Sequence, residues 1–354
     1  MIPYVEVIGK YSLKPFAIIE PSQCWFEISY YEIGEFEVYC VASNENLEAL
    51  KCGNYIKIPN KPYLWVIKSI EYTYSADGAR MIDAKGFEAK WIINQRIIPN
   101  PKQLDTDLAE AVFGLVDENL GENADQNRTI EGFKAIRPTF SKTITDTQAT
   151  RGNLWEFIAN ILKASQCGSY SYFDGNINFL AFEGRDVSDR IVFSQSMDNL
   201  ISSNYFESSE NKRTFAKIVS TQTSNDVTEE SVVDFDQGGS NIDRLETLVA
   251  SNISTKYKDE SGVEQETPFG SQLYKQWQTE EGRNALAEQI IVKDFAGEID
   301  LQNSQYEFEK DFFLGDIVKV KDEFFGYSAK ARIAKYTFKQ DASGYGEEAD
   351  YGNE

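Results

Sequence analysis

Apolar and polar residues alternate along most of the chain with the two-residue period of β-strands. Trp25–Tyr30 and Glu35–Cys40 show this alternation on either side of a turn at Gly34. Because successive side chains of a strand point to opposite faces, such segments predict a sheet with one apolar and one wet face. The same pattern predicts further strands at Leu64–Tyr74, Arg80–Lys85, Ile191–Phe193, Leu200–Phe206, Phe215–Gln222 and Ser231–Phe235.

Three segments instead repeat their apolar residues at helical spacing. They are Asp105–Asn119, with Asp105 or Thr106 as its N-cap, Asn153–Ser165, and residues 269–293. Their predicted buried positions are Leu108, Ala111, Val112, Leu115, Val116, Leu154, Phe157, Ile158, Ile161, Leu162, Leu273, Trp277, Ala285, Leu286 and Ile290. A hairpin, Tyr170–Phe173 and Ile177–Phe182, follows the second helix. The chain is therefore predicted to be mainly β with α+β inserts.

Two distant stretches have nearly the same pattern. Gly53–Ile58 is followed by Ile70–Tyr74, and Gly315–Val320 is followed by Ala334–Phe338. Each reads as a glycine turn, a short strand, a hairpin loop and a second strand in which Tyr, Thr and an aromatic residue stand in a row. The spacing from the Gly to the Tyr-Thr pair differs by two residues, which a longer hairpin loop would absorb. Either two hairpins converged by chance, or a small β-barrel is duplicated.

The duplication hypothesis predicts two similar antiparallel β-barrel domains separated by inserts. The Pro99-Asn100-Pro101 run gives a boundary signal, and an amphipathic turn from Gly86, with Phe87 and Trp91 to Ile93, is expected to plug one barrel end. The predicted domains are a first β-barrel at 1–98, an α+β insert at 99–190, strands returning to the barrels at 191–240, a loop and helix insert at 241–293, and a second β-barrel at 294–354 with part of 191–240.

The composition narrows the classes of function. The 354 residues contain no histidine, which removes Ser-His-Asp and Cys-His catalysis and His-ligated zinc. The net charge of −22, spread along the chain, disfavours binding to nucleic-acid phosphates or anionic membranes. No apolar run approaches the roughly 18–20 residues of a membrane helix, and the N-terminus lacks a signal-peptide layout. The four cysteines, Cys24, Cys40, Cys52 and Cys167, show no Cys-x-x-Cys spacing, and three are expected as reduced, buried thiols in or beside strands.

No motif predicts a catalytic, cofactor-binding or metal-binding residue. Asp234, Asp236 and Gly238 begin like a calcium loop, but the twelfth position is Leu245, where a bidentate Glu is needed. Gly344-Tyr345-Gly346 lacks the strand-then-helix context of a dinucleotide site, and Gly184-Arg185-Asp186 reads as a turn with a local ion pair. Two carboxylates at glycosidase spacing, or a Ser–Lys dyad, stay open as alternatives, although the sequence singles out no pair.

Several stretches, in this order and spacing, resemble the tail-associated, Gp37-like tail-tip hub family of siphophages, which is related in fold to contractile-tail baseplate hubs. The resemblance covers about residue 25 to the C-terminus. The stretches that carry it are Gly34–Val38, Gly53 with its strand, the predicted hairpin turn Asp77-Gly78 through Gly86-Phe87 to Gln95-Arg96-Ile97, Glu183–Ser188, Gly282–Glu288 and Leu314–Val318.

The resemblance implies a structural protein of a phage or prophage virion. Such hubs carry two similar β-barrels and form a homotrimeric, pseudo-sixfold ring at the tail tip, where they meet the distal tail protein and the tail tube and tape-measure proteins. DNA passes through the ring without specific binding. For this chain we expect synthesis in the bacterial cytoplasm, no membrane insertion, no cofactor and no enzymatic activity. The alternative is a tail-associated glycan-acting hydrolase or carbohydrate-binding module that uses carboxylates and aromatic residues.

Overall fold

The computed structural model describes residues 2–74, 78–200, 202–224, 226–259, 262–290, 292–298, 304–324 and 326–352. The predicted turn residue Asp77 and part of the second predicted barrel, residues 299–303, lie outside the described residues. The predicted fold class is confirmed in its coarse form, since strands dominate and the longer α-helices lie in the inserts.

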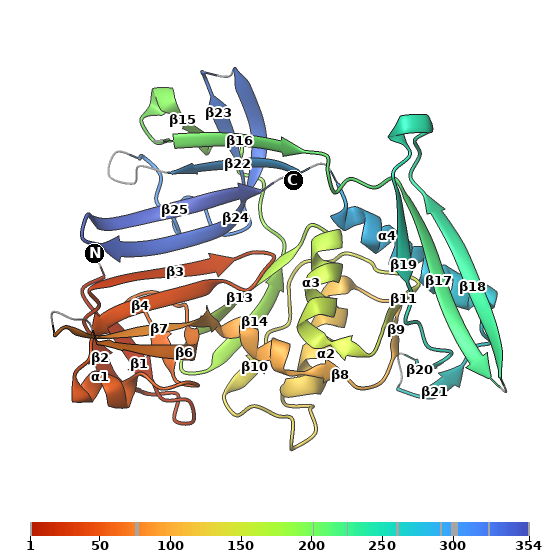
Figure 1. Cartoon of the computed structure of the whole chain (residues 1–354), viewed down its shortest axis with the longest axis horizontal. Helices are drawn as coiled ribbons and strands as arrows, with labels where there is room; N and C mark the ends of the chain where they lie inside the picture. Colours follow the sequence, from red (N-terminus) through yellow and green to blue (C-terminus); the bar gives the residue numbers. More distant parts are fainter. Residues whose placement is uncertain are drawn as a thin grey trace.

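One large sheet of 13 strands forms the left-hand side of Figure 1. Its strand order is β16-β22-β25-β24-β3-β4-β7-β6-β5-β1-β2, with β23 paired to β24 and β15 paired to β23. Its members are β1 (Val5–Ile8), β2 (Pro15–Ile19), β3 (Gln23–Ser29), β4 (Glu35–Val41), β5 (Tyr55–Lys57), β6 (Trp65–Tyr74), β7 (Arg80–Glu88), β15 (Val192–Ser194), β16 (Ser202–Ser208), β22 (Val292–Glu298), β23 (Ile317–Asp322), β24 (Tyr327–Asp341) and β25 (Gly344–Gly352). A short helix, α1 (Asn44–Ala49), joins β4 to β5.

Two six-stranded runs of this sheet correspond strand for strand. The first run, β3-β4-β7-β6-β5-β1, matches the second, β16-β22-β25-β24-β23-β15, in sheet order and in chain order. In the first run all neighbouring strands are antiparallel, including β1 and β5. In the second run all are antiparallel except β15, which is parallel to β23. We call these runs the first and the second unit.

The hydrogen bonds of the two predicted repeats also match. The Gly53 N–H donates to the Ile67 carbonyl and the Gly315 N–H donates to the Ile333 carbonyl, each over 2.8 Å. Both glycines have left-handed backbone, with φ of 94° and 83°. A β-bulge follows Ile67 on β6 and Ile333 on β24. The pattern shared by the two stretches therefore reflects a repeated three-dimensional arrangement.

The bulges correct one detail of the predicted alignment. If Ile67 corresponds to Ile333, then Tyr72 corresponds to Phe338, whereas the sequence pattern had matched Tyr72 to Tyr336. The error arose because the loop before the second strand differs in length by more than the Tyr-Thr match suggested.

Two separate β-barrels are not confirmed. Among the described residues the hydrogen-bonded ladders do not close, and the two units share one sheet and one apolar core. The reason lies in β24, whose first half pairs with β23 and whose second half pairs with β25 on one side and with β3 of the first unit on the other. If the second unit were a closed barrel, the second half of β24 would have to pair within that unit. It pairs with β3 instead and so joins the second unit to the first.

The α+β insert packs against the first unit around a core of its own. It comprises β8 (Ile97–Ile98), β9 (Lys102–Leu104), α2 (Leu108–Leu120), β10 (Phe133–Ala135), β11 (Thr147–Ala149), β12 (Gly152–Asn153), α3 (Leu154–Ala164), β13 (Gly168–Phe173) and β14 (Ile177–Phe182). The predicted apolar faces of α2 and α3 are buried, except that Phe157 is half-buried. The N-cap of α2 is Asp107, whose side chain accepts from the Ala109 N–H, and neither Asp105 nor Thr106 caps the helix.

The turn from Gly86, predicted to plug a barrel end, instead packs into this second core. It forms the 3₁₀ helix η1 (Ala89–Gln95), and its Ile92 and Ile93 are buried among residues of the insert.

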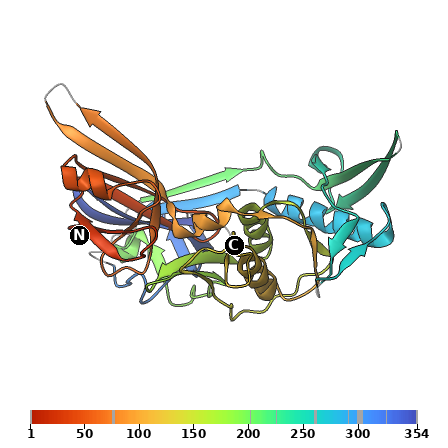
Figure 2. The same cartoon turned by 90° about the horizontal axis from the view of Figure 1, so that it is seen from below.

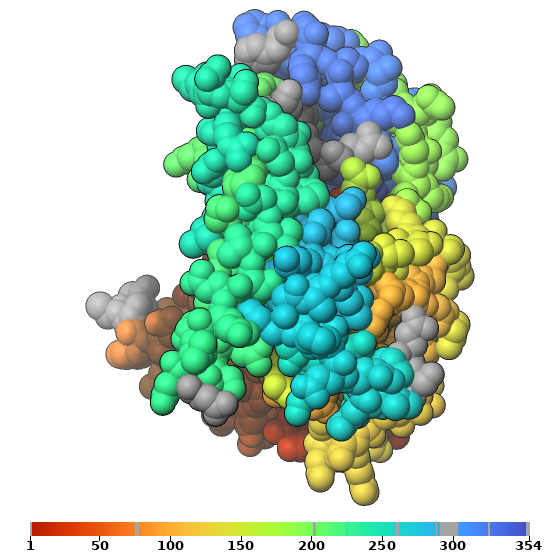
Figure 3. Space-filling view, turned by 90° about the vertical axis from the view of Figure 1, so that its right-hand side faces the viewer, coloured from red at the N-terminus to blue at the C-terminus, as the bar shows by residue number. Residues whose placement is uncertain are grey.

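A second insert forms the other end of the molecule. It contains a sheet of β17 (Phe215–Ser224), β18 (Val227–Asp236) and β19 (Glu246–Ala250), covered by α4 (Gln272–Glu288), and Figure 3 shows α4 beside this sheet. β20 (Lys256–Lys258) and β21 (Glu264–Glu266) extend the small sheet of β9 and β11, while η2 (Gln195–Met197) and η3 (Asn241–Asp243) are single turns. Trp277 and Leu286 of α4 are buried as predicted, but Ile290 lies beyond the helix end and is 49% exposed.

Of the strands between 191 and 240, β15 and β16 lie in the large sheet, whereas β17 and β18 belong to the second insert. No described helix is long and apolar enough to cross a membrane.

Candidate functional site

The junction at which β24 of the second unit pairs with β3 of the first unit joins the two halves of the molecule. Lys335 lies opposite Ser29, and the antiparallel register continues to Gln340 opposite Cys24. Phe338 lies opposite Phe26 on the core face, and both rings are fully buried. On the other face the Lys335 ammonium lies 3.4 Å from carboxylates of Glu27 and Glu32. The junction therefore combines a backbone ladder, an aromatic pair and a cation held between two anions.

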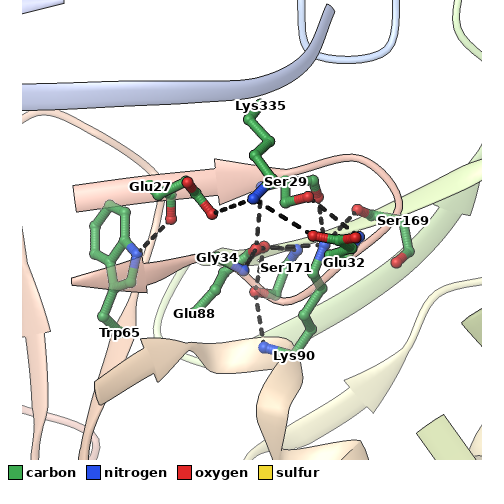
Figure 4. A network of polar contacts seen from close by, with 10 residues as sticks. All are labelled: Glu27, Ser29, Glu32, Gly34, Trp65, Glu88, Lys90, Ser169, Ser171 and Lys335. Atoms are coloured by element: carbon green, nitrogen blue, oxygen red, sulfur yellow. Dashed lines mark hydrogen bonds and ion pairs between the residues drawn. The ribbon is translucent and has the colours of Figure 1, made fainter. Parts of the chain in front are cut away.

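A fully buried ion pair lies behind this junction, where the first unit meets the α+β insert (Figure 4). The Lys90 ammonium lies 3.3 Å from the Glu88 carboxylate, and neither side chain is exposed. Lys90 also donates to the carbonyl of Ser29 and, over 2.9 Å, to that of Ser169. Glu88 accepts from the backbone N–H groups of Gly34, Ser29 and Ser171. The pair thus forms hydrogen bonds to β3, to the turn at Gly34 and to β13 of the insert, and so holds these three segments together.

The two charges of this pair depend on each other. Burial raises the pKa of Glu88 and lowers that of Lys90, while the attraction between the two groups and the backbone donors to Glu88 opposes both shifts. With its partner present each group keeps a compensated charge. Without that partner, the remaining group would be a bare charge in a dry interior.

Gly184-Arg185-Asp186 does not form the predicted local ion pair. Arg185 donates to the Asp316 carboxylate, and Asp186 accepts from Lys330 over 2.6 Å, so both partners come from the second unit. Hydrogen bonds from Lys330 and Ser188 hold the pKa of Asp186 below its ordinary range. A Cβ atom on Gly184 would lie 1.7 Å from the Gly315 carbonyl oxygen, so the stretch passes directly against the repeated glycine turn. Its charged residues fasten the insert to the second unit.

The other face of the large sheet is polar and acidic. Strands β3, β4, β7, β24 and β25 place six carboxylates and three lysines on this face around the junction, namely Glu27, Glu35, Glu37, Asp83, Glu348, Asp350, Lys85, Lys335 and Lys339. Lys85 bridges Glu37 and Asp83, with both distances 2.9 Å. A shallow hollow of about 390 Å³ lies on this face over the junction, between Trp25 and Lys339. This face of the sheet is polar and negatively charged, whereas the opposite face packs into the apolar core.

The motifs considered for chemistry form no site. Asp234 and Asp236 pair with Lys217 and Arg244, and no group of metal-ligating side chains forms among the described residues. Gly344-Tyr345-Gly346 lies in β25. Cys24, Cys40 and Cys167 are free and buried as predicted, and burial raises the pKa of Cys24 to about 12 and of Cys40 to about 11.

One cavity invites comparison with a glycosidase cleft. It has a volume of about 280 Å³ between α3 and α4, and Trp277, Glu280 and Glu281 line it. Burial raises the pKa of both acids. They are consecutive residues of one helix, however, and the facing wall carries amides and hydroxyls such as Gln148 and Thr147. Among the residues that line the cavity, no carboxylate faces them from the opposite wall, as glycoside hydrolysis would need.

The sequence reasoning missed the buried pair and the long-range ion pairs. Glu88 and Lys90 alternate with apolar neighbours in Phe87–Ile93, and two charges inside such a run were the available signal. Arg185 and Asp316 gave no comparable signal, because 131 residues separate them.

The comparison with family models and the comparison with solved structures both find phage tail proteins. The sequence model of the family described as Siphovirus ReqiPepy6 Gp37-like protein matches residues 20–353. No curated protein matches the chain. Among solved structures, the tail protein of Neisseria meningitidis MC58 is similar with a TM-score of 0.58 and 11% identity, over 99% of this chain and 96% of that one.

Two prophage proteins are also similar in fold. The 43 kDa tail protein of prophage MuSo2 from Shewanella oneidensis has a TM-score of 0.58 and 13% identity, over 99% of this chain and 98% of that one. Prophage tail protein gp18 from Listeria monocytogenes EGD-e has a TM-score of 0.52 and 11% identity, over 99% and 94% of the two chains.

Proposed function

The chain belongs to the siphovirus ReqiPepy6 Gp37-like family of phage tail proteins, and from this premise we propose that it is a structural hub of the tail tip. Three copies close a ring in which the two units of each chain supply six similar segments. The ring joins a threefold tip to a sixfold tail tube, and it lets DNA pass. Its neighbours are the distal tail protein and the tail tube and tape-measure proteins.

The duplicated six-stranded unit is the observation that carries this proposal. A threefold protein can meet a sixfold ring without mismatch only if each chain offers two similar surfaces. The two units supply such surfaces, because their strand order, chain order and glycine-turn hydrogen bonds agree. Homo-oligomers with closed symmetry are also the usual assemblies of soluble proteins.

The acidic face around the β24–β3 junction suits the wall of a DNA channel. Its excess of carboxylates repels phosphate over about 8–10 Å, which is the screening length at moderate salt. We propose that this face lines part of the channel, so that DNA slides without sticking. Retention of duplex DNA by the assembled protein at about 0.15 M salt would contradict this assignment.

We propose no catalytic role, since the carboxylates that line the cavity beside Trp277 come from one helix, and those of the polar face lie on a shallow, open hollow. Shape and pairing surfaces, rather than a reaction, then account for the function.

The mass of the purified chain in solution tests the hub proposal. We expect a native mass of about three times the 40.2 kDa of one chain, measured by light scattering or native mass spectrometry. The distal tail protein should bind this species with threefold stoichiometry or a multiple of it. A stable dimer, or a monomer that stays monomeric with the distal tail protein added, would contradict the proposal.

A further inference from the structure

Among the strand edges of the large sheet that have no strand partner in the described residues are one edge of β6 and one edge of β16. On β6, pairing with β5 stops at Trp65 and Val66, so Ser69–Tyr74 pairs only with β7. At one end of the sheet, β16 pairs only with β22. Figure 2 shows the β6–β7 hairpin reaching beyond the rest of the molecule. Natural proteins rarely leave long strand edges open, because such edges recruit other chains.

The internal repeat identifies the strands of the other unit that correspond to these two edge strands. In the correspondence of the units, β6 is the counterpart of β24 and β16 is the counterpart of β3. Within one chain β24 and β3 are paired with each other. The pairing of their counterparts, β6 with β16, is the one junction that the repeat implies and a single chain does not make.

We infer that the β6 edge of one copy pairs antiparallel with the β16 edge of a second copy, in the register of the β24–β3 junction. This inference rests on the proposed ring and specifies its contact between chains. In this register Tyr72 lies opposite Tyr205, just as Phe338 lies opposite Phe26 within one chain. Thr73 likewise lies opposite Asn204, as Lys339 lies opposite Trp25.

The backbone of β6 is oriented for this ladder. The Ile67 N–H and carbonyl bond to Asn54 and Gly53, and the Lys68 carbonyl accepts from the Cys52 thiol, so both residues face the outer edge. Alternation along the strand then turns the N–H and carbonyl groups of Tyr72 outward. Ala334, the counterpart of Lys68, likewise directs its carbonyl outward and accepts from the Tyr30 N–H of the first unit.

The side chains along the two edges also suit each other. Tyr72 is 57% exposed although its counterpart Phe338 is fully buried, so pairing would cover an aromatic ring that now faces water. Tyr205 contributes a second aromatic residue opposite it, next to the Tyr327 ring at 4.8 Å. Phe206, 53% exposed, lies opposite Glu71, and no like charges oppose each other in this register.

The contact is head-to-tail, because the β6 edge and the β16 edge are different surfaces. Such contacts build closed rings or open filaments, whereas a self-complementary patch would build a twofold dimer. Each chain has one edge of each kind, so every copy in a closed ring is satisfied on both sides.

A disulfide placed across the inferred junction tests its register. Thr73 and Asn204 form a non-hydrogen-bonded pair, the geometry in which opposing Cα atoms lie about 4.5 Å apart and a disulfide fits. In a Cys52→Ser background, which removes the exposed thiol, Thr73→Cys with Asn204→Cys should give covalent dimers and trimers on a non-reducing gel after mild oxidation. Thr73→Cys with Ser208→Cys is the matched control, since four residues move the thiols about 13 Å apart.

The outcomes separate this inference from the hub proposal. Cross-linking of the first pair, at least tenfold faster than of the control, supports the β6–β16 junction. A trimeric mass without cross-linking of the first pair, or with equal cross-linking of the control, overturns the junction and leaves the ring standing. A protein that stays monomeric at every concentration, also with the distal tail protein added, and gives no cross-linked species overturns both.

Discussion

Replacing Lys90 with methionine is expected to lower the free energy of unfolding by about 3–5 kcal/mol, measured by urea denaturation at pH 7. Methionine fills a similar volume, so the loss is mainly electrostatic. The Glu88 carboxylate would stay fully buried without the ammonium 3.3 Å away. The Ser29 and Ser169 carbonyls would also lose their donor.

A double variant and a surface variant serve as controls for this prediction. Lys90→Met combined with Glu88→Gln removes both charges and should recover a measurable part of the loss. Lys217→Met breaks the ion pair with Asp234, in which both side chains are about half exposed, and should cost less than about 1 kcal/mol. Equal small losses for Lys90→Met and Lys217→Met would show that the buried pair does not hold the insert to the first unit.

Replacing Tyr72 with proline is expected to abolish the ring while leaving the fold of the chain intact. The outward N–H of Tyr72 would be lost, together with the aromatic ring opposite Tyr205, and proline is tolerated at edge positions whose N–H faces outward. The native mass should fall from three chains to one at micromolar protein, with an unchanged far-ultraviolet circular dichroism spectrum.

Tyr72→Phe is the matched control, since it keeps the ring and the N–H and should remain trimeric. A Tyr72→Pro variant that stays trimeric would place the contact between chains elsewhere on the molecule.

The periodic elements were predictable because their signal is local. Helices α2 and α3 bury the predicted stripe, since an apolar face at helical spacing has one way to leave water. The repeat around Gly53 and Gly315 was also visible, because a left-handed turn position strongly favours glycine. Residues that fix local backbone geometry therefore reveal the duplicated arrangement in the amino-acid sequence itself.

The way in which the units join was not predictable, because it depends on contacts between distant segments. Nothing in β24 shows that its second half leaves β23 and pairs with β3, which prevents two separate barrels. The burial of Glu88 and Lys90 likewise depends on β13, about 80 residues away in the chain. Such features arise from tertiary packing, which a single sequence does not encode in any local period.

The proposed ring would also account for the lack of a conventional site among the described residues. A hub acts through edges that become complete only in the assembly, and an isolated chain shows them as open strands with exposed aromatic residues. In that proposal the acidic face would line the channel, whereas the buried pair stabilises the subunit itself.

Electron cryomicroscopy of the purified assembly, viewed end-on, tests the central claim most directly. The account predicts a closed ring of three chains whose inner wall shows six similar β-segments around an open channel, with the inserts outside. An open filament, a twofold dimer, or a threefold particle in which the two units of each chain occupy unlike positions would contradict it.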